Sequence, residues 1–245
     1  GCPVGYSAMG GQTLNPYGRR EFETGGSSSG SGAAVAANYA VAAIGSETSG
    51  SILSPSAKNS IVGLKPTIGA LSRSGIVPIS SSMDTAGPMT KNVIDNAILM
   101  SALVAEDSLD TYSFKSLPIR FDHLDTVSFK GFRLGLNRNF EDDSLMKIAV
   151  VKMKSEGAEI IPFTPRKINM DQFRRLLDVD MRSDLPQYFT TFANSKLGLD
   201  SVKDVLNFNA KDSLLHAPYG QGIFQRISKE NRSQAKFDST KKAIM

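Results

Sequence analysis

Two clusters of glycine and serine, at 25–32 and 45–51, flank an alanine-rich segment near the start of the chain. Glycine permits tight turns and alanine favours helix, so the pattern predicts a helix over 32–43 between two loops. Loops of this kind can hold two hydroxyl groups close together at one end of a helix. That arrangement is one of the few that permit acyl-transfer chemistry without a nearby histidine. The two histidines, His123 and His216, both lie far downstream.

Composition narrows the class of protein. The chain has 245 residues, 40% of them hydrophobic and 21% charged, as expected for a globular protein with a sizeable core. The net charge of +4 is dispersed, with no basic block among aromatic residues, so nucleic-acid binding is disfavoured. The single cysteine, Cys2, excludes a disulfide framework and a Cys-x-x-Cys metal site, and favours a reducing, cytoplasmic compartment. No apolar run reaches the ~20 residues that span a membrane.

The hydrophobic pattern predicts an α/β protein. We expect strands at 61–66, 132–136 and 159–162, and helices at 91–104, 144–157 and 170–192. Because a strand, a helix and a strand follow one another between 132 and 162, neighbouring strands are expected to be parallel. Residues 80–88 are expected to form a loop, 105–128 a polar connection, and 195–245 short helical pieces.

The first cluster has three interpretations when it is taken alone. It resembles a flexible linker, but it leads directly into a helix rather than into a second domain. It lacks the Gly-Lys-Ser/Thr ending of a phosphate loop. It matches Gly-x-Ser-x-Gly with Ser28 at the centre, but no apolar strand precedes it, as a nucleophile elbow requires. Both histidines are expected to have structural roles.

Taken together, the clusters closely resemble the amidase signature family, and its peptide-amidase-like branch in particular. The resemblance covers residues 5–104, and the interval between Ser27 and Ser51 matches that of the family's paired serines. The segments that carry it are 9–16, 25–31, 45–52, 55–57, 62–67, 69–75 and 82–88. Two positions depart from the pattern: Ser49 replaces a common glycine, and Leu53 stands where many members have arginine.

The resemblance implies a site and a fold. Ser51 would be the nucleophile, Ser27 would lie at a cis peptide bond and relay the proton, and a neutral lysine would be the base. The backbone N–H groups of Thr48, Ser49, Gly50 and Ser51 would form the oxyanion hole. Ser28 would support the site by hydrogen bonding, and Met9 and Gly10 would line an acyl pocket. The implied fold is a mixed twisted β-sheet covered by α-helices.

The base is the largest departure from the family pattern. The family's lysine precedes the first serine cluster, whereas the first lysine here is Lys58. We expect Lys58 and Lys65 to be structural or solvated. The absence of an initiator methionine and of a stop signal near Met245 suggests an internal piece of a longer protein. The expected domain is therefore a single incomplete one, with a signature core at 1–104 and a helix-rich peripheral part at 105–245.

These features together predict an amidase that hydrolyses a small carboxamide or peptide amide through an acyl-enzyme on Ser51, with no metal and no cofactor. The chain alone is expected to be nearly inactive, because the base is missing. One alternative is the amidase subunit of a tRNA-dependent amidotransferase, which works with a partner protein. Another is a non-catalytic binding fragment. If no further segments cover the exposed sheet edge and apolar surface, we expect poor solubility or a homo-oligomer.

Overall fold

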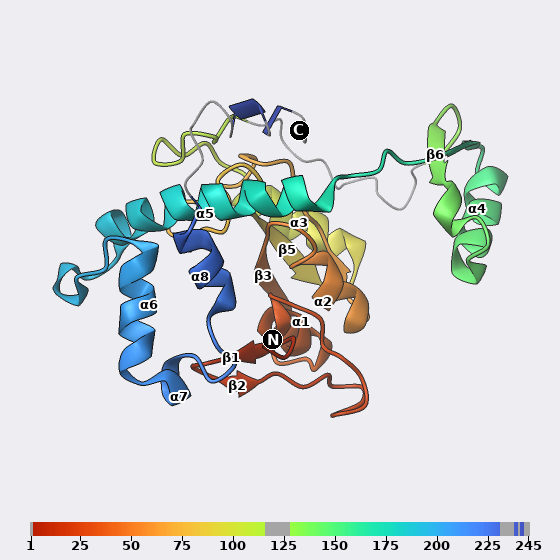
Figure 1. Cartoon of the computed structure of the whole chain (residues 1–245). Helices are drawn as coiled ribbons and strands as arrows, with labels where there is room; N and C mark the ends of the chain where they lie inside the picture. The colour runs from red at the N-terminus through yellow and green to blue at the C-terminus, as the bar shows by residue number, and fades with distance from the viewer. Residues whose placement is uncertain (1, 116–127, 231–237, 240, 243–245) are drawn as a thin grey trace. The chain divides into compact units, whose positions relative to one another are not determined.

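The computed structural model describes residues 2–115, 128–230, 238–239 and 241–242 (Figure 1). The chain forms two compact units. The first combines Gly1–Arg120 with Asp171–Met245, and the second is Phe121–Met170.

The first unit contains most of the helices and strands, many of which are labelled in Figure 1. Its strands are β1 (Tyr6–Ser7), β2 (Gly11–Gln12), β3 (Ala42–Glu47), β4 (Val62–Gly63) and β5 (Thr85–Thr90). Its α-helices are α1 (Ser29–Ala36), α2 (Leu53–Lys58), α3 (Val93–Leu103), α5 (Met170–Phe192), α6 (Val202–Lys211), α7 (Ser213–His216) and α8 (Gly222–Ser228). A 3-10 turn, η2, covers Ser195–Leu197.

The second unit is a strand–helix–strand motif. It consists of β6 (Arg133–Asn137), the 3-10 turn η1 (Arg138–Phe140), α4 (Ser144–Ser155) and β7 (Glu159–Phe163). The carboxylate of Asp143 accepts a hydrogen bond from Met146 N at 2.8 Å and so caps α4. Strands β6 and β7 are parallel, as the order of elements in the sequence predicted.

The three-stranded sheet of the first unit corrects two expectations. Its order is β3–β5–β4, and both pairs are antiparallel. The helix expected over 32–43 ends at Ala36, and residues from Ala42 onward form β3 instead. The loop expected over 80–88 gives way to β5 from Thr85. Pairing of β3 with β5 along their whole length satisfies backbone groups that the local propensities could not reveal.

A proline makes β5 unlike a central strand in the sequence. Pro88 lies inside the central strand, a position that usually excludes proline because the residue has no N–H to donate. Here its carbonyl accepts hydrogen bonds from Leu64 N at 3.1 Å and from the side chain of Asn96 at 3.1 Å. The carbonyl group of Pro88 is therefore hydrogen-bonded, although the residue has no N–H to donate.

Three apolar clusters form the core of the first unit. The first joins α1, β5 and the start of α2 through Val35, Ile52 and Met89, which are fully buried. A second lies between α3 and the segment 70–86. The third joins α5, α6 and α8 through Leu185, Val202 and Ile227, in agreement with the grouping of these helices in Figure 1.

The α/β fold class is therefore confirmed. The long helix α5 has the bounds that its periodicity predicted, whereas the strand expected at 61–66 is reduced to the two residues of β4. Within the described part of the chain, no helix is both long and apolar enough to cross a membrane. The cytoplasmic location and the single-domain organisation stay predictions.

Candidate active site

The two serines of the predicted site line the same cavity. It has a volume of about 20 Å³ and is bounded by the two Gly/Ser loops and the segment 76–84. Its lining residues are Ser27, Ser46, Glu47, Thr48, Ser51, Ile76, Val77, Ile79 and Asp84. The peptide bond between Gly26 and Ser27 is cis. Folding thus brings together two hydroxyl-bearing residues from separate clusters.

Ser28 ties the two loops to each other. Its backbone N–H donates to the carbonyl of Ser51 at 3.1 Å. Its hydroxyl donates to the carbonyl of Ser46 and accepts from Ser46 N–H, both at 3.1 Å. These three hydrogen bonds fix the first cluster against the second: one joins two backbone groups, and the other two join the Ser28 hydroxyl to the backbone of Ser46.

The loop 48–51 leaves backbone donors free. Among the described residues, none accepts a hydrogen bond from the N–H of Ser49, Gly50 or Ser51. Gly50 has φ 92°, a left-handed conformation that glycine adopts without steric cost. Unpaired N–H groups at a tight turn are suited to an anion or a developing oxyanion.

Two charged side chains anchor the loop 48–51 by hydrogen bonds. The carboxylate of Glu47 is buried and accepts hydrogen bonds from Ile52 N at 2.7 Å and Leu53 N at 2.9 Å. Lys65 lies 3.9 Å from the other oxygen of this carboxylate, and its Nζ donates to the carbonyl of Thr48 at 2.5 Å. Both ends of the loop are thereby attached to charged groups.

Asp84 closes the third side of the cavity. One of its oxygens accepts a 2.5 Å hydrogen bond from the Thr48 hydroxyl. The other accepts from the N–H groups of Ile79 and Ser80, both at 2.8 Å. Asp84 is only 6% exposed, so these three donors replace water as the partners of a buried carboxylate.

Helix α5 continues this network from a distant part of the chain. Asp180 accepts a hydrogen bond from the Ser80 hydroxyl at 2.5 Å, and Asp184 accepts one from Ser81 N at 2.7 Å. Burial raises the pKa of Asp184; hydrogen bonds from Ser81 oppose this shift, and the charges of Asp180 and Asp84 add to it. The segment 76–84 is thus held by side chains of α5 as well as by its own turn.

Sequence reasoning missed one of these residues. Asp84 has no signal of its own in the sequence beyond its place in the segment 82–88, whereas Lys65 was expected to be structural or solvated, and its hydrogen bond to the Thr48 carbonyl agrees with a structural role. A buried carboxylate with three donors and a lysine against the candidate oxyanion loop emerge only when segments distant in sequence meet. Lys58 pairs with Glu23 at 3.7 Å on the surface, consistent with its expected role.

Two predicted site residues lie elsewhere. Met9 is 97% exposed, and Gly10 is also exposed, in the turn between β1 and β2. Neither lines the Ser27–Ser51 cavity, so their part in an acyl pocket stays a prediction. His216 stacks on Phe208 with ring centroids 4.7 Å apart, a packing role. His123 lies outside the described residues.

Comparison with known proteins identifies the class. The family model named Amidase matches residues 3–239. The chain therefore belongs to the amidase family. The sequence resemblance to this family is confirmed.

Individual relatives agree with this assignment. The structure resembles peptide amidase from Stenotrophomonas maltophilia, with a TM-score of 0.86 and 34% identity over 98% of this chain and 51% of that chain. It also resembles an amidase family protein from Bacillus anthracis, with a TM-score of 0.85 and 32% identity over 98% of this chain and 49% of that one.

Another relative of this chain is named as a subunit of an amidotransferase. A glutamyl-tRNA(Gln) amidotransferase subunit from Ruegeria sp. is 43% identical over 155 residues, which cover 62% of this chain and 31% of the relative. The chain thus spans about a third of this relative and about half of the two solved structures.

Proposed function

We propose that this protein hydrolyses a carboxamide through an acyl-enzyme on Ser51. The observation that supports this most directly is the shared cavity of Ser27 and Ser51 beside the free N–H groups of 49–51. A serine hydroxyl attacks the amide carbon, and the N–H groups stabilise the resulting oxyanion. The proton taken from Ser51 is passed to the amide nitrogen as the C–N bond breaks, so that ammonia or an amine leaves, and water then hydrolyses the ester on Ser51 to release the acid.

Ser27 is proposed to relay the proton of Ser51. A hydroxyl group both donates and accepts, so it can pass a proton from the nucleophile to a base without changing its own charge. Ser28 is proposed to hold both loops in place by the hydrogen bonds described above. Glu47 and Asp84 fix the loop that carries the oxyanion donors.

The proposed base is a lysine that precedes the first serine cluster, as the family resemblance implies. Residues 1–26 contain no lysine. We therefore propose that residues 1–245 alone react slowly, and that a lysine-bearing segment restores the rate. A lysine acts as a base only when burial or a neighbouring cation lowers its pKa.

A fluorophosphonate probe and intact mass measurement test the nucleophile. We would label the 245-residue chain and a version extended upstream to include a lysine-bearing segment. We expect labelling at Ser51 in the extended form. Labelling should be much slower in the 245-residue chain and absent after Ser51→Ala. Ser155→Ala, a change of an exposed serine in the second unit, is the matched control. Labelling at another serine, or of neither form, would contradict the proposal.

The second candidate is the amidase subunit of a tRNA-dependent amidotransferase. The Ruegeria relative, which is 43% identical over 155 residues, supports it. The candidate requires a partner protein and tRNA. Co-purification of a second subunit with the natural protein would favour it, and amide hydrolysis by the isolated protein would favour the first proposal.

A further inference from the structure

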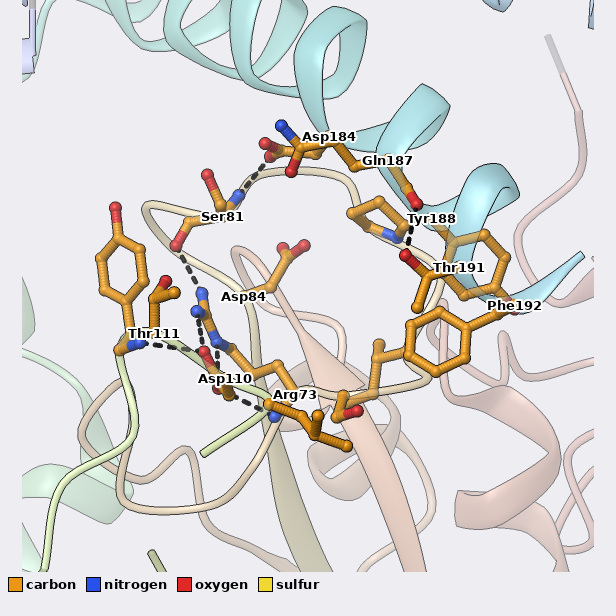
Figure 2. A pocket seen from close by; sticks show the side chains of 15 residues that line it. Arg73, Ser81, Asp84, Asp110, Thr111, Asp184, Gln187, Tyr188, Thr191 and Phe192 are labelled. Carbon is orange, nitrogen blue, oxygen red and sulfur yellow. Dashed lines mark hydrogen bonds and ion pairs between the residues drawn. The ribbon is translucent and has the colours of Figure 1, made fainter. Parts of the chain in front are cut away.

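A larger cavity adjoins the Ser27–Ser51 cavity. Its volume is about 320 Å³, within the range of small-molecule sites. The two cavities share Ile76 and Asp84, so both adjoin the segment 76–84. Figure 2 shows the larger one as a ring, with Asp184 on α5 opposite Arg73 and Asp110.

One wall of this cavity is aromatic. Tyr188 and Phe192 come from the last turns of α5, with ring centroids 5.4 Å apart. Leu109 and Tyr112 contribute apolar surface from the 109–112 segment. Aromatic faces of this kind attract flat apolar groups and cations.

The positive charge that lines the cavity is already neutralised. Arg73 donates to both oxygens of Asp110, at 2.8 and 2.5 Å, and to the carbonyl of Ser81. Its guanidinium also lies 4.4 Å from the ring centroid of Tyr112. Lys241 donates to the Tyr112 hydroxyl at 3.3 Å but does not line the cavity. The geometry therefore disfavours an anionic ligand.

A negative charge remains unbalanced. Asp184 is held by Ser81, and no lysine, arginine or histidine of the described ranges forms an ion pair with it. Asp84 also lines the cavity; its hydrogen bonds come from neutral donors, but its charge acts on Arg73, so Asp184 is the carboxylate that lacks a cation. A half-buried carboxylate without a counter-ion favours a bound cation, because burial removes the water that would otherwise stabilise its charge.

We infer that this cavity binds a positively charged group of the amide substrate, with Asp184 as its counter-ion and Tyr188 and Phe192 as its apolar wall. The inference rests on the proposed function, because it makes the occupant part of the molecule that Ser51 attacks. It adds a substrate class: amides that carry an ammonium, amidinium or guanidinium group beside an apolar portion.

Benzamidinium and benzamide form a suitable pair of probes, because they have nearly the same shape and differ in charge. We would titrate each into the 245-residue chain carrying Ser51→Ala and follow backbone amide signals by NMR. Benzamidinium is expected to bind at least tenfold more tightly and to shift the Ser81 amide signal. Equal affinity of the two probes would overturn the inference.

Two further variants assign the preference to Asp184. Asp184→Asn is expected to reduce the preference for benzamidinium to less than threefold, whereas Asp142→Asn, at an exposed carboxylate of the second unit, should leave it unchanged. A preference that persists after Asp184→Asn would contradict the assignment. If that variant does not fold, the Ser81 signal in the parent chain decides, because Ser81 N–H is bonded to Asp184.

This experiment is independent of acylation, since it uses a chain without Ser51. Binding of benzamidinium without fluorophosphonate labelling of the unmutated protein would overturn the proposed function and leave the cation site standing. Labelling without a preference for benzamidinium would overturn only the cation site.

Discussion

The hydroxyl of Thr48 donates a 2.5 Å hydrogen bond to the carboxylate of Asp84, 36 positions further along the chain. Thr48 begins the loop that carries the candidate oxyanion donors, and Asp84 lines both cavities. One buried contact therefore links the candidate nucleophile loop to the wall of the proposed substrate site.

Removal of the Thr48 hydroxyl should weaken both the fold and the site. Thr48→Val keeps the shape but leaves Asp84 without one donor, which costs about 1–3 kcal/mol of stability. The labelling rate of Ser51 should fall about tenfold as the loop loses its anchor. Urea unfolding and fluorophosphonate labelling measure the two effects. Thr190→Val, at an exposed position of α5, is the control and should change neither.

Ser27 should matter for rate and not for stability. We expect Ser27→Ala to slow labelling of Ser51 in the extended chain by about 10²–10⁴-fold, the usual contribution of proton transfer. Because Ser27 is exposed, the free energy of unfolding should change by less than about 0.5 kcal/mol. A labelling rate within threefold of the unmutated protein would exclude the proposed relay.

Lys65 contacts the candidate oxyanion loop, so it should be tested as the catalytic base. Its Nζ bonds the Thr48 carbonyl, and we expect a supporting role. Lys65→Met should then slow labelling of the extended chain by less than about tenfold, with a loss of about 1–2 kcal/mol of stability. Lys58→Met, which removes a surface lysine, provides the comparison. A loss of more than a thousandfold only for Lys65→Met would identify Lys65 as the base.

Asp110 gives the fold a defined pH dependence. Hydrogen bonds from Arg73 lower the pKa of Asp110 to about 2; burial opposes this shift, and the N–H groups of Tyr112 and Arg73 assist it. A carboxyl group whose pKa is lower in the folded than in the unfolded state stabilises the fold fully at pH values above the unfolded pKa of about 4. This stabilisation is lost as the pH falls to about 2.

Urea unfolding as a function of pH measures this contribution. We expect about 2 kcal/mol of the free energy of unfolding to disappear between about pH 5 and about pH 2 through this group. Asp110→Asn should be less stable at neutral pH and lack this part of the decrease, whereas Asp142→Asn should retain it. An unchanged pH profile in Asp110→Asn would refute the assignment.

Some elements of the fold could be predicted because their signals are local. The apolar periodicity of 170–192 gives the bounds of α5, and the order of elements between 132 and 162 gives the parallel pair β6 and β7. The paired Gly/Ser clusters gave the family, because the spacing of Ser27 and Ser51 is itself a property of the sequence.

Other features depended on partners far along the chain. The start of β3 continues an alanine-rich run with helical propensity, yet it forms a strand because β5 pairs with it along its whole length. Pro88 argues locally against a strand, yet its carbonyl finds donors from Leu64 and from α3.

The sequence by itself therefore determined the family, the pair of candidate serines and the helices with strong periodicity. Only the tertiary structure decided which groups surround those serines. Asp84 meets Thr48, Lys65 meets the carbonyl of Thr48, and Asp184 meets Ser81 across 103 positions. Such contacts arise when distant segments pack, because hydrogen bonds and burial depend on distance in space, and a single sequence records only distance along the chain.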